Sequence, residues 1–192
     1  MSNTVYTTIS RTRIEDNNIQ GIATFGAAQI AIEDSVVTGS IRNILGAGLG
    51  AGLSASKVRI SIARSLISRG VCGLCVETPG DGGSVRVVIM DSTISGNLAN
   101  GIDVGYGFAA TGCTLEAIVT RTQVTHNGGG IVTDGGLCNS QVWLDSVTVF
   151  ENGDVGGEVV ARNNGKVFTR QNSTIADVTA TTGGTVVPWP AQ

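Results

Sequence analysis

The sequence predicts an all-β protein that folds as a right-handed parallel β-helix of about seven coils with three parallel sheets. Three observations support this fold class. Short runs rich in Val, Ile and Thr alternate apolar and polar residues with period 2, as strands do. The runs recur at regular intervals, and 28 glycines against only 3 prolines supply tight turns between them. Such repetition is typical of a solenoid, in which each repeat packs only on its neighbours.

The repeat is clearest in the middle of the chain. Residues Val87–Asn97 read apolar-x-apolar-x-Asp-Ser-x-Ile before a turn, and Gly101–Val104 follow as Gly-Ile-x-Val. Residues Ala117–Asn127 and Gly130–Thr133 follow the same pattern, with Arg-Thr-x-Val in place of Asp-Ser-x-Ile and Gly-Ile-x-Thr in place of Gly-Ile-x-Val. One apolar anchor per repeat falls at Ile14, Val37, Ile67, Ile94, Val124, Val149 and Ile175, so the differences between successive anchors are 23, 30, 27, 30, 25 and 26 residues.

Two columns of polar residues are expected where the repeats turn. Strands of neighbouring coils lie about 4.8 Å apart, so equivalent residues stack directly. The first column alternates in charge: Arg11, Asp34, Arg64, Asp91, Arg121, then Asp145 or Ser146, then Arg170. The second contains Asn17, Ser40, Gly70, Asn97, Asn127 and Asn152, where asparagine tolerates a left-handed backbone. We interpret the charge column as a device that sets the register, with a charged binding strip as the alternative.

Length and composition favour one domain covering residues 1–192, with 177–192 as an irregular C-terminal tail, although the chain can be a piece of a longer protein. The net charge of −3 argues against a nucleic-acid partner, and the absence of an 18-residue apolar run argues against a membrane span. Residues Met1–Thr4 are polar and show no secretory leader, so either the protein is cytoplasmic or a leader has been trimmed.

The Gly-Ile-x-Val strand after an Asn corner, in Asn97–Val104 and Asn127–Thr133, resembles the right-handed parallel β-helix repeat family, which shares its fold with pectate lyases. The resemblance covers residues 5–176. It implies a polysaccharide ligand, above all a uronate polymer, and favours an extracellular or cell-surface location. Fold alone does not establish function.

The chain departs from that family in two respects. It shows no capping helix before Val5–Ile9, so homo-oligomer formation through the open coil end is a further expectation. It also lacks the family's catalytic clusters and its clustered calcium-binding acids. We therefore predict no cofactor, and Ca²⁺ is unsupported.

The outward face of the first sheet is the expected site. Its central stripe reads Ala31, Ser61, Val88, Ile118, Trp143 and Phe168. An exposed apolar stripe indicates a subunit contact, a covering segment such as residues 188–190, or a ligand groove. In a groove, Trp143 would stack on a sugar, and Arg59 and Arg86 would hold a carboxylate. Glu116 is a further candidate ligand-binding residue, or pairs with the arginines across strands.

Catalysis is the weaker alternative. Glu116 and Asp145 are expected on adjacent coils two positions apart, a spacing compatible with the carboxylate pair of a glycosidase. Two outward acids also arise by chance. The leading hypothesis is a non-catalytic module that binds carbohydrate or presents a repeated surface. The alternatives are a polysaccharide lyase, epimerase or hydrolase, and a structural element of a filament, spike or shell.

The four cysteines leave their redox state open. Cys113 and Cys138 occupy matching places in neighbouring coils, where a disulfide and two free thiols are both reasonable. Cys72 and Cys75 form a lone C-x-x-C, which is a weak signal for zinc or redox chemistry. The single histidine, His126, is expected to be solvated, and no metal site is predicted. The glycine-rich stretch Ile41–Ala51 is expected to be an inserted loop.

Overall fold

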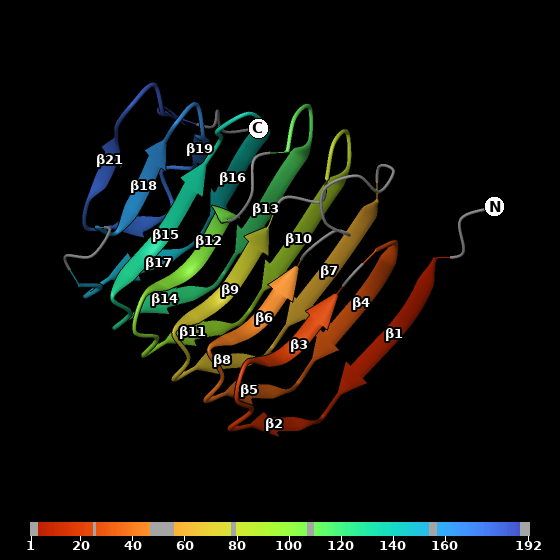
Figure 1. The fold of residues 1–192 in the computed structure, drawn as a ribbon. Coiled ribbons are helices and arrows are strands. Elements are labelled where there is room, and N and C mark those ends of the chain that lie inside the picture. Colours follow the sequence, from red (N-terminus) through yellow and green to blue (C-terminus); the bar gives the residue numbers. More distant parts are fainter. Residues whose placement is uncertain are drawn as a thin grey trace.

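The computed structural model describes residues 4–24, 26–46, 56–77, 80–106, 110–153 and 157–188. In these residues every regular element is a strand, and the strands form three parallel sheets that wind into a solenoid (Figure 1). Successive strands belong to the first, second and third sheet in turn, so each coil contributes one strand to every sheet. The predicted fold class is confirmed.

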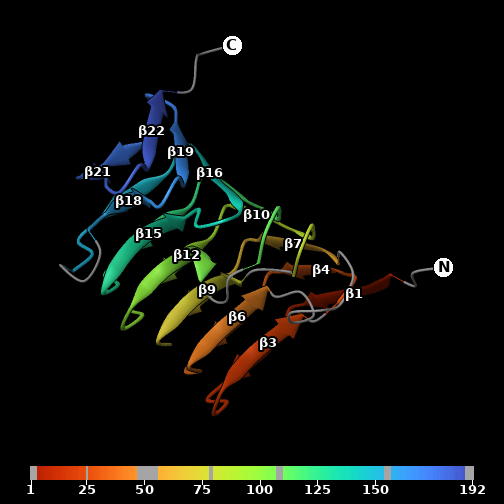
Figure 2. The same cartoon turned by 45° about the horizontal axis from the view of Figure 1, so that its top comes forward.

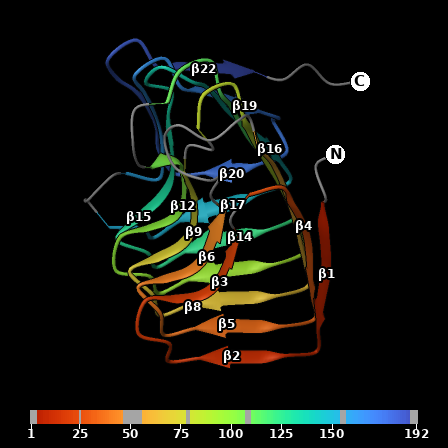
Figure 3. The ribbon, with the colours of Figure 1, turned by 45° about the vertical axis from the view of Figure 1, so that its right-hand side comes forward.

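The strands of each sheet follow in spatial order. The first sheet contains β1 (Val5–Ser10), β4 (Ala28–Glu33), β7 (Lys57–Ala63), β10 (Ser84–Met90), β13 (Thr114–Thr120), β16 (Asn139–Asp145), β19 (Lys166–Thr169) and β22 (Thr185–Pro188). The second contains β2 (Arg13–Glu15), β5 (Val36–Thr38), β8 (Leu66–Ser68), β11 (Thr93–Ser95), β14 (Gln123–Thr125), β17 (Thr148–Phe150) and β20 (Thr174–Ile175). The third contains β3 (Gln20–Thr24), β6 (Arg42–Gly46), β9 (Cys72–Glu77), β12 (Asn100–Tyr106), β15 (Gly129–Asp134), β18 (Val159–Arg162) and β21 (Val178–Ala180). Figure 2 shows the first and third sheets side by side, and Figure 3 shows the short strands of the second sheet stacked on one another.

The core is a set of apolar columns inside the coils. On the first sheet, Ile32, Ile62, Ile89, Val119 and Leu144 pair in register from strand to strand, and each is fully buried. Burial of one such side chain contributes about 1.5–3 kcal/mol to folding. Alternation with period 2 therefore decides which face of each strand points inward, as the sequence predicts.

Each of the first six coils turns at two left-handed residues that lie five positions apart. The first set is Arg11, Asp34, Arg64, Asp91, Arg121 and Ser146, with φ between +45° and +56°. The second set is Asp16, Gly39, Arg69, Gly96, His126 and Glu151. The second set precedes the Asn column by one residue, so the prediction of a left-handed backbone at the asparagines themselves is wrong. Their side chains hydrogen-bond neighbouring backbone groups, which is the second property that favours asparagine at such a corner.

A column of hydroxyl groups follows the first corner, and the sequence analysis assigned it no role. The backbone N–H of Thr12 donates to Ser35 Oγ (3.1 Å), that of Ser35 to Ser65 Oγ (3.2 Å), and that of Ser65 to Ser92 Oγ (3.2 Å). Each serine hydroxyl in turn donates to the carbonyl two residues before it. The hydroxyl groups of Ser35, Ser65 and Ser92 thus satisfy corner groups that no sheet hydrogen bond reaches, whereas the sixth coil carries Val147 at this position.

The charge column pairs between coils. Arg64 Nε donates to Asp34 Oδ1 and Arg121 Nε to Asp91 Oδ1, both at 2.7 Å. These contacts hold the pKa of each aspartate below its usual range, mainly through the arginine hydrogen bond. In the sixth coil the left-handed position belongs to Ser146, the second of the two residues that the sequence left open.

The asparagine column is hydrogen-bonded along the solenoid axis. Asn97 Nδ2 donates to Asn127 Oδ1 (2.8 Å), and Asn127 Nδ2 donates to Asn152 Oδ1 (2.9 Å). In the N-terminal coils the column holds Ser40 and Gly70, and the buried Asn43 replaces the missing amides. Its Oδ1 accepts the Ser40 N–H (3.1 Å), and its Nδ2 donates to Asn97 Oδ1 (3.1 Å).

Two expectations about irregular segments are wrong. Residues 177–192 are not an irregular tail throughout, because β21 pairs with β18 and β22 pairs with β19. The expected loop Ile41–Ala51 contains β6, which pairs with β3 and β9. Apolar residues at alternate positions, such as Ile44 (fully buried) and Val186 (packed on the core), stabilise these strands. The remainder of both segments, 47–51 and 189–192, lies outside the described residues.

Candidate functional site

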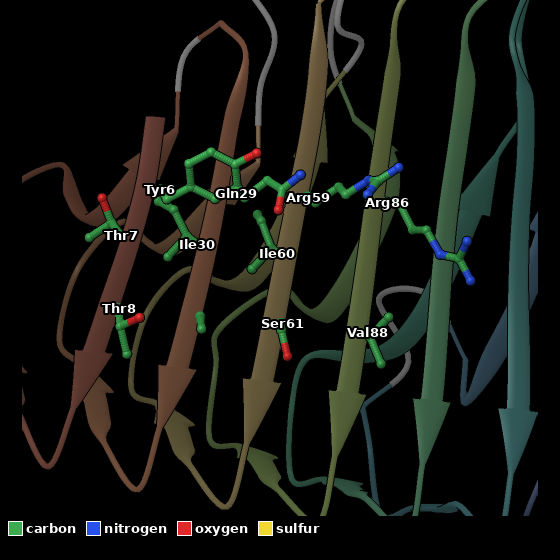
Figure 4. A pocket seen from close by; sticks show the side chains of 11 residues that line it. Tyr6, Thr7, Thr8, Gln29, Ile30, Arg59, Ile60, Ser61, Arg86 and Val88 are labelled. Atoms are coloured by element: carbon green, nitrogen blue, oxygen red, sulfur yellow. The ribbon is translucent and has the colours of Figure 1, made fainter. Parts of the chain in front are cut away.

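A hollow of about 480 Å³ lies on the outer face of the first sheet, across β1, β4, β7 and β10 (Figure 4). Tyr6, Gln29, Arg59 and Arg86 form one row of its lining, because the strands pair these residues in register. A second row contains Thr8, Ala31, Ser61 and Val88. The predicted outward stripe is thus aligned as the sequence indicates, and its N-terminal half, Ala31, Ser61 and Val88, lines this hollow.

The size of the second-row side chains explains where the hollow ends. Ala31 and Ser61 are small, so the surface sinks between the larger residues of the first row. Beyond Val88 the same row continues with the larger residues Ile118, Trp143 and Phe168, none of which lines this hollow. The site is therefore set by a change in side-chain size along one register row.

The two arginines of the site have different surroundings. Arg86 Nε lies 3.1 Å from Glu116 Oε2, so its charge is largely matched. Arg59 is exposed and makes no hydrogen bond or ion pair with any described residue. A carboxylate can accept bidentate hydrogen bonds from such a guanidinium. The structure thus brings together Arg59, Arg86 and Glu116, three of the four predicted ligand-binding residues.

Trp143 is not part of the hollow. Its ring stacks on Phe168, with ring centroids 3.9 Å apart and planes at 10°. One face of the indole is therefore covered by another side chain of the same sheet. The aromatic residue in the hollow is Tyr6, whose exposed fraction is 72%. Tyr6 was not among the predicted site residues, and aligning Val5–Ser10 with Ala28–Glu33 in the sequence would have identified it, because Tyr6 pairs with Gln29.

The proposed carboxylate pair is contradicted. Asp145 pairs in register with Thr120, which is four residues after Glu116 and not two. At about 3.3 Å per residue the two acids are about 13 Å apart along the strands, beyond the roughly 5–9.5 Å of glycosidase pairs. Asp145 also accepts hydrogen bonds from Asn172 (2.8 Å) and Arg170 (3.0 Å), and the Asn172 hydrogen bond is the main cause that holds its pKa below the usual range.

All four cysteines are paired. Cys113 and Cys138 form a disulfide between neighbouring coils, with Cα atoms 4.7 Å apart. Cys72 and Cys75 form a second one on β9, with Cα atoms 6.2 Å apart. The sequence alone leaves open whether these cysteines are disulfide-bonded or free thiols. His126 Nε2 lies 2.9 Å from Glu151 Oε2, so the histidine is exposed but has a partner.

The described residues contain no group of three or more His, Cys, Asp or Glu side chains that could hold a metal ion. In the same residues, no helix is long and apolar enough to cross a membrane.

Comparison with known proteins adds no relative. No protein-family model matches the chain, and no curated protein or solved structure is significantly similar to it. The parallel β-solenoid is therefore shown by the structure itself, whereas the likeness to pectate-lyase-type proteins stays a resemblance of repeat pattern. Function has to be argued from the surface of this chain.

Proposed function

We propose that the chain binds an acidic polysaccharide in the hollow of the first sheet and does not cleave it. One observation carries the proposal: Arg59 is an exposed cation in a concave surface, and no described residue neutralises its charge. Ligand sites combine a concave surface with a few polar groups that fix orientation. The hollow has both properties.

The lining suits an acidic sugar. Arg59 would hold a carboxylate, and the Tyr6 ring would pack on the apolar face of a sugar ring. The Gln29 amide, between them in the row, can donate to one hydroxyl and accept from another. Because rungs repeat about every 4.8 Å, a chain of sugars lying across the strands would meet a new side chain of the row at each rung.

A binding role without catalysis is consistent with the surroundings of the two candidate catalytic acids, Glu116 and Asp145. Glu116 is paired with Arg86, and Asp145 is held by Arg170 and Asn172. Neither is free near the hollow, and their separation does not suit a general acid and base working on one glycosidic bond.

The test is isothermal titration calorimetry with polygalacturonate and with the same polymer after methyl esterification. We expect binding of the acid form only, weakened by added salt. Arg59→Gln should lower the affinity about tenfold or more, since a charge-assisted hydrogen bond contributes about 1.5–3 kcal/mol.

Arg69→Gln is the matched control, because it removes one exposed positive charge at the corner between the second and third sheets. It should leave binding unchanged. Equal affinity for both polymers, no binding of either, or equal losses in the two variants would each overturn the proposal.

A further inference from the structure

A second polar cluster lies on the outer face of the third sheet. Leu74 and Val76 point into the interior core, whereas Cys72 and Cys75 pack with Leu45 in a separate apolar cluster outside it. The two cysteines of the C-x-x-C therefore share the outer face of β9, where they are joined as a disulfide. Cys72 is the more accessible of the two, with an exposed fraction of 8% against 1% for Cys75.

Asp103 lies beside this disulfide. It pairs in register with Cys75 across β12 and β9, so both side chains occupy the same face on neighbouring strands. Its exposed fraction is 4%. Asn100 Nδ2 donates to Oδ2 at 2.7 Å, while Oδ1 is buried without a hydrogen-bond partner among the described residues. A buried carboxylate with an unsatisfied oxygen is costly when ionised, and retaining a proton relieves that cost.

Other charged groups around Asp103 are already engaged. On β9, Glu77 pairs with Arg42 on β6 at 3.1 Å. On β15, Asp134 accepts a hydrogen bond from Arg162 of β18 at 3.0 Å. Burial raises the pKa of Asp103, and the Asn100 hydrogen bond and Arg162 oppose this only in part. Asp103 is thus a buried acid with a raised pKa, and it lies next to a cysteine pair.

We propose that Cys72–Cys75 is an exchangeable disulfide, opened by a dithiol reductant, with Asp103 as the proton donor to Cys75. The reductant's thiolate attacks Cys72 Sγ, because Cys72 is the more accessible of the two residues. A new sulfur–sulfur bond forms there, the Cys72–Cys75 bond breaks, and Cys75 Sγ leaves with the electron pair and takes the proton of Asp103.

The second reductant thiol then completes the exchange. As its thiolate attacks the reductant sulfur of the mixed disulfide, Cys72 leaves as a thiolate and takes up a proton from solvent. The proton lost by this second thiol restores Asp103. The dithiol is oxidised to a cyclic disulfide, and the protein gains two thiols.

The experiment uses the whole chain with dithiothreitol as the probe. Samples are quenched with acid, alkylated and analysed by peptide mass spectrometry, so that opening of each disulfide is followed separately. Cys113–Cys138 is the internal control, since it experiences the same thiolate concentration at every pH. Circular dichroism verifies that the protein stays folded during the measurement.

In the wild-type protein the opening rate of Cys72–Cys75, divided by that of Cys113–Cys138, should fall as pH rises and Asp103 ionises. Asp103→Asn should lower this ratio about tenfold or more at acidic pH and abolish its pH dependence, because the general acid is lost. The exposed control Asp177→Asn should behave as wild type.

Equal ratios in wild type and Asp103→Asn at every pH would overturn the proposal, and so would opening of Cys72–Cys75 only on unfolding. Single-cysteine variants test which sulfur is attacked. Cys72 in Cys75→Ser should form a mixed disulfide with oxidised glutathione faster than Cys75 in Cys72→Ser. The opposite order would contradict the assignment.

Discussion

Arg64 Nε donates a 2.7 Å hydrogen bond to Asp34 Oδ1 although the two residues are 30 positions apart in the sequence. Arg121 and Asp91 repeat the same contact, again 30 positions apart. All four residues have a left-handed backbone at the same corner. The alternation of charge visible in the sequence is therefore a column of ion pairs along the solenoid.

Reversing one charge in this column should destabilise the protein. Asp91→Arg would place three arginines at neighbouring positions of the column, and like charges directly opposite each other repel. The backbone conformation is not an obstacle, because Arg64 and Arg121 adopt it already. The midpoint of urea unfolding should fall, and the double variant Asp91→Arg/Arg121→Asp should regain part of the loss. A double variant as unstable as the single one would show that pairing is irrelevant.

The asparagine column should contribute more to the stability of the fold than the charge column does. Asn127 is almost fully buried and donates to the Ile94 and Thr125 carbonyls and to Asn152 Oδ1. Asn127→Ala should lower the free energy of unfolding by about 3 kcal/mol, since each buried group left unsatisfied costs about 1–3 kcal/mol. Urea denaturation measures this. Asn18→Ala, at an exposed asparagine, is the matched control and should change little. Similar losses in both variants would contradict the assignment.

Replacing Gly70 with alanine should destabilise the protein. A Cβ there would lie 2.6 Å from the Ser40 carbonyl oxygen and 2.7 Å from Asn43 Nδ2. Gly70→Ala should therefore cost about 1–3 kcal/mol of stability through overpacking. Gly96→Asn is the comparison, because nothing lies within 4 Å of a Cβ there and asparagine tolerates the left-handed backbone. Unfolding curves should separate the two variants clearly.

Asp103 should make stability depend on pH. Burial raises its pKa in the folded protein, so the folded chain binds more protons than the unfolded chain between the ordinary aspartate pKa and the raised one. Stability should consequently fall as pH rises through this window. Asp103→Asn should flatten that part of the profile, measured by urea unfolding at a series of pH values. A wild-type curve without this decline, or a variant with the same decline, would contradict the expectation.

The two aromatic residues should have separable roles. Trp143→Ala should lower stability, because the stacked pair with Phe168 contributes about 0.5–1.5 kcal/mol beyond the buried area. It should not affect polygalacturonate binding. Tyr6→Ala should weaken binding and leave the thermal midpoint nearly unchanged, since Tyr6 is 72% exposed. If Trp143→Ala weakened binding and Tyr6→Ala did not, Trp143 and not Tyr6 would be the aromatic residue of the binding site.

The sequence was sufficient to predict the position of a residue where one physical rule alone determines it. Alternation with period 2 identified the inward columns, and the repeat spacing aligned Arg59 with Arg86. The sequence was insufficient to predict the role of a residue whose hydrogen-bond partners lie in other coils. Asn43 occupies a position at which other coils carry glycine, and only its contacts with Ser40 and Asn97 reveal its role. Asp103 is buried although it lies on the outer face of the third sheet, and alternation with period 2 predicts an exposed side chain there.

The constant interval of five residues between the two left-handed corners has a consequence for engineering. All variation in coil length, from 23 to 30 residues, falls outside this interval. Peptides grafted after the third-sheet strands should be tolerated, whereas a single residue inserted between the corners would shift every later side chain of that coil to the opposite face. The second-sheet segment therefore has a constant length in the first six coils, and the turns after the third-sheet strands are where new sequence can be added.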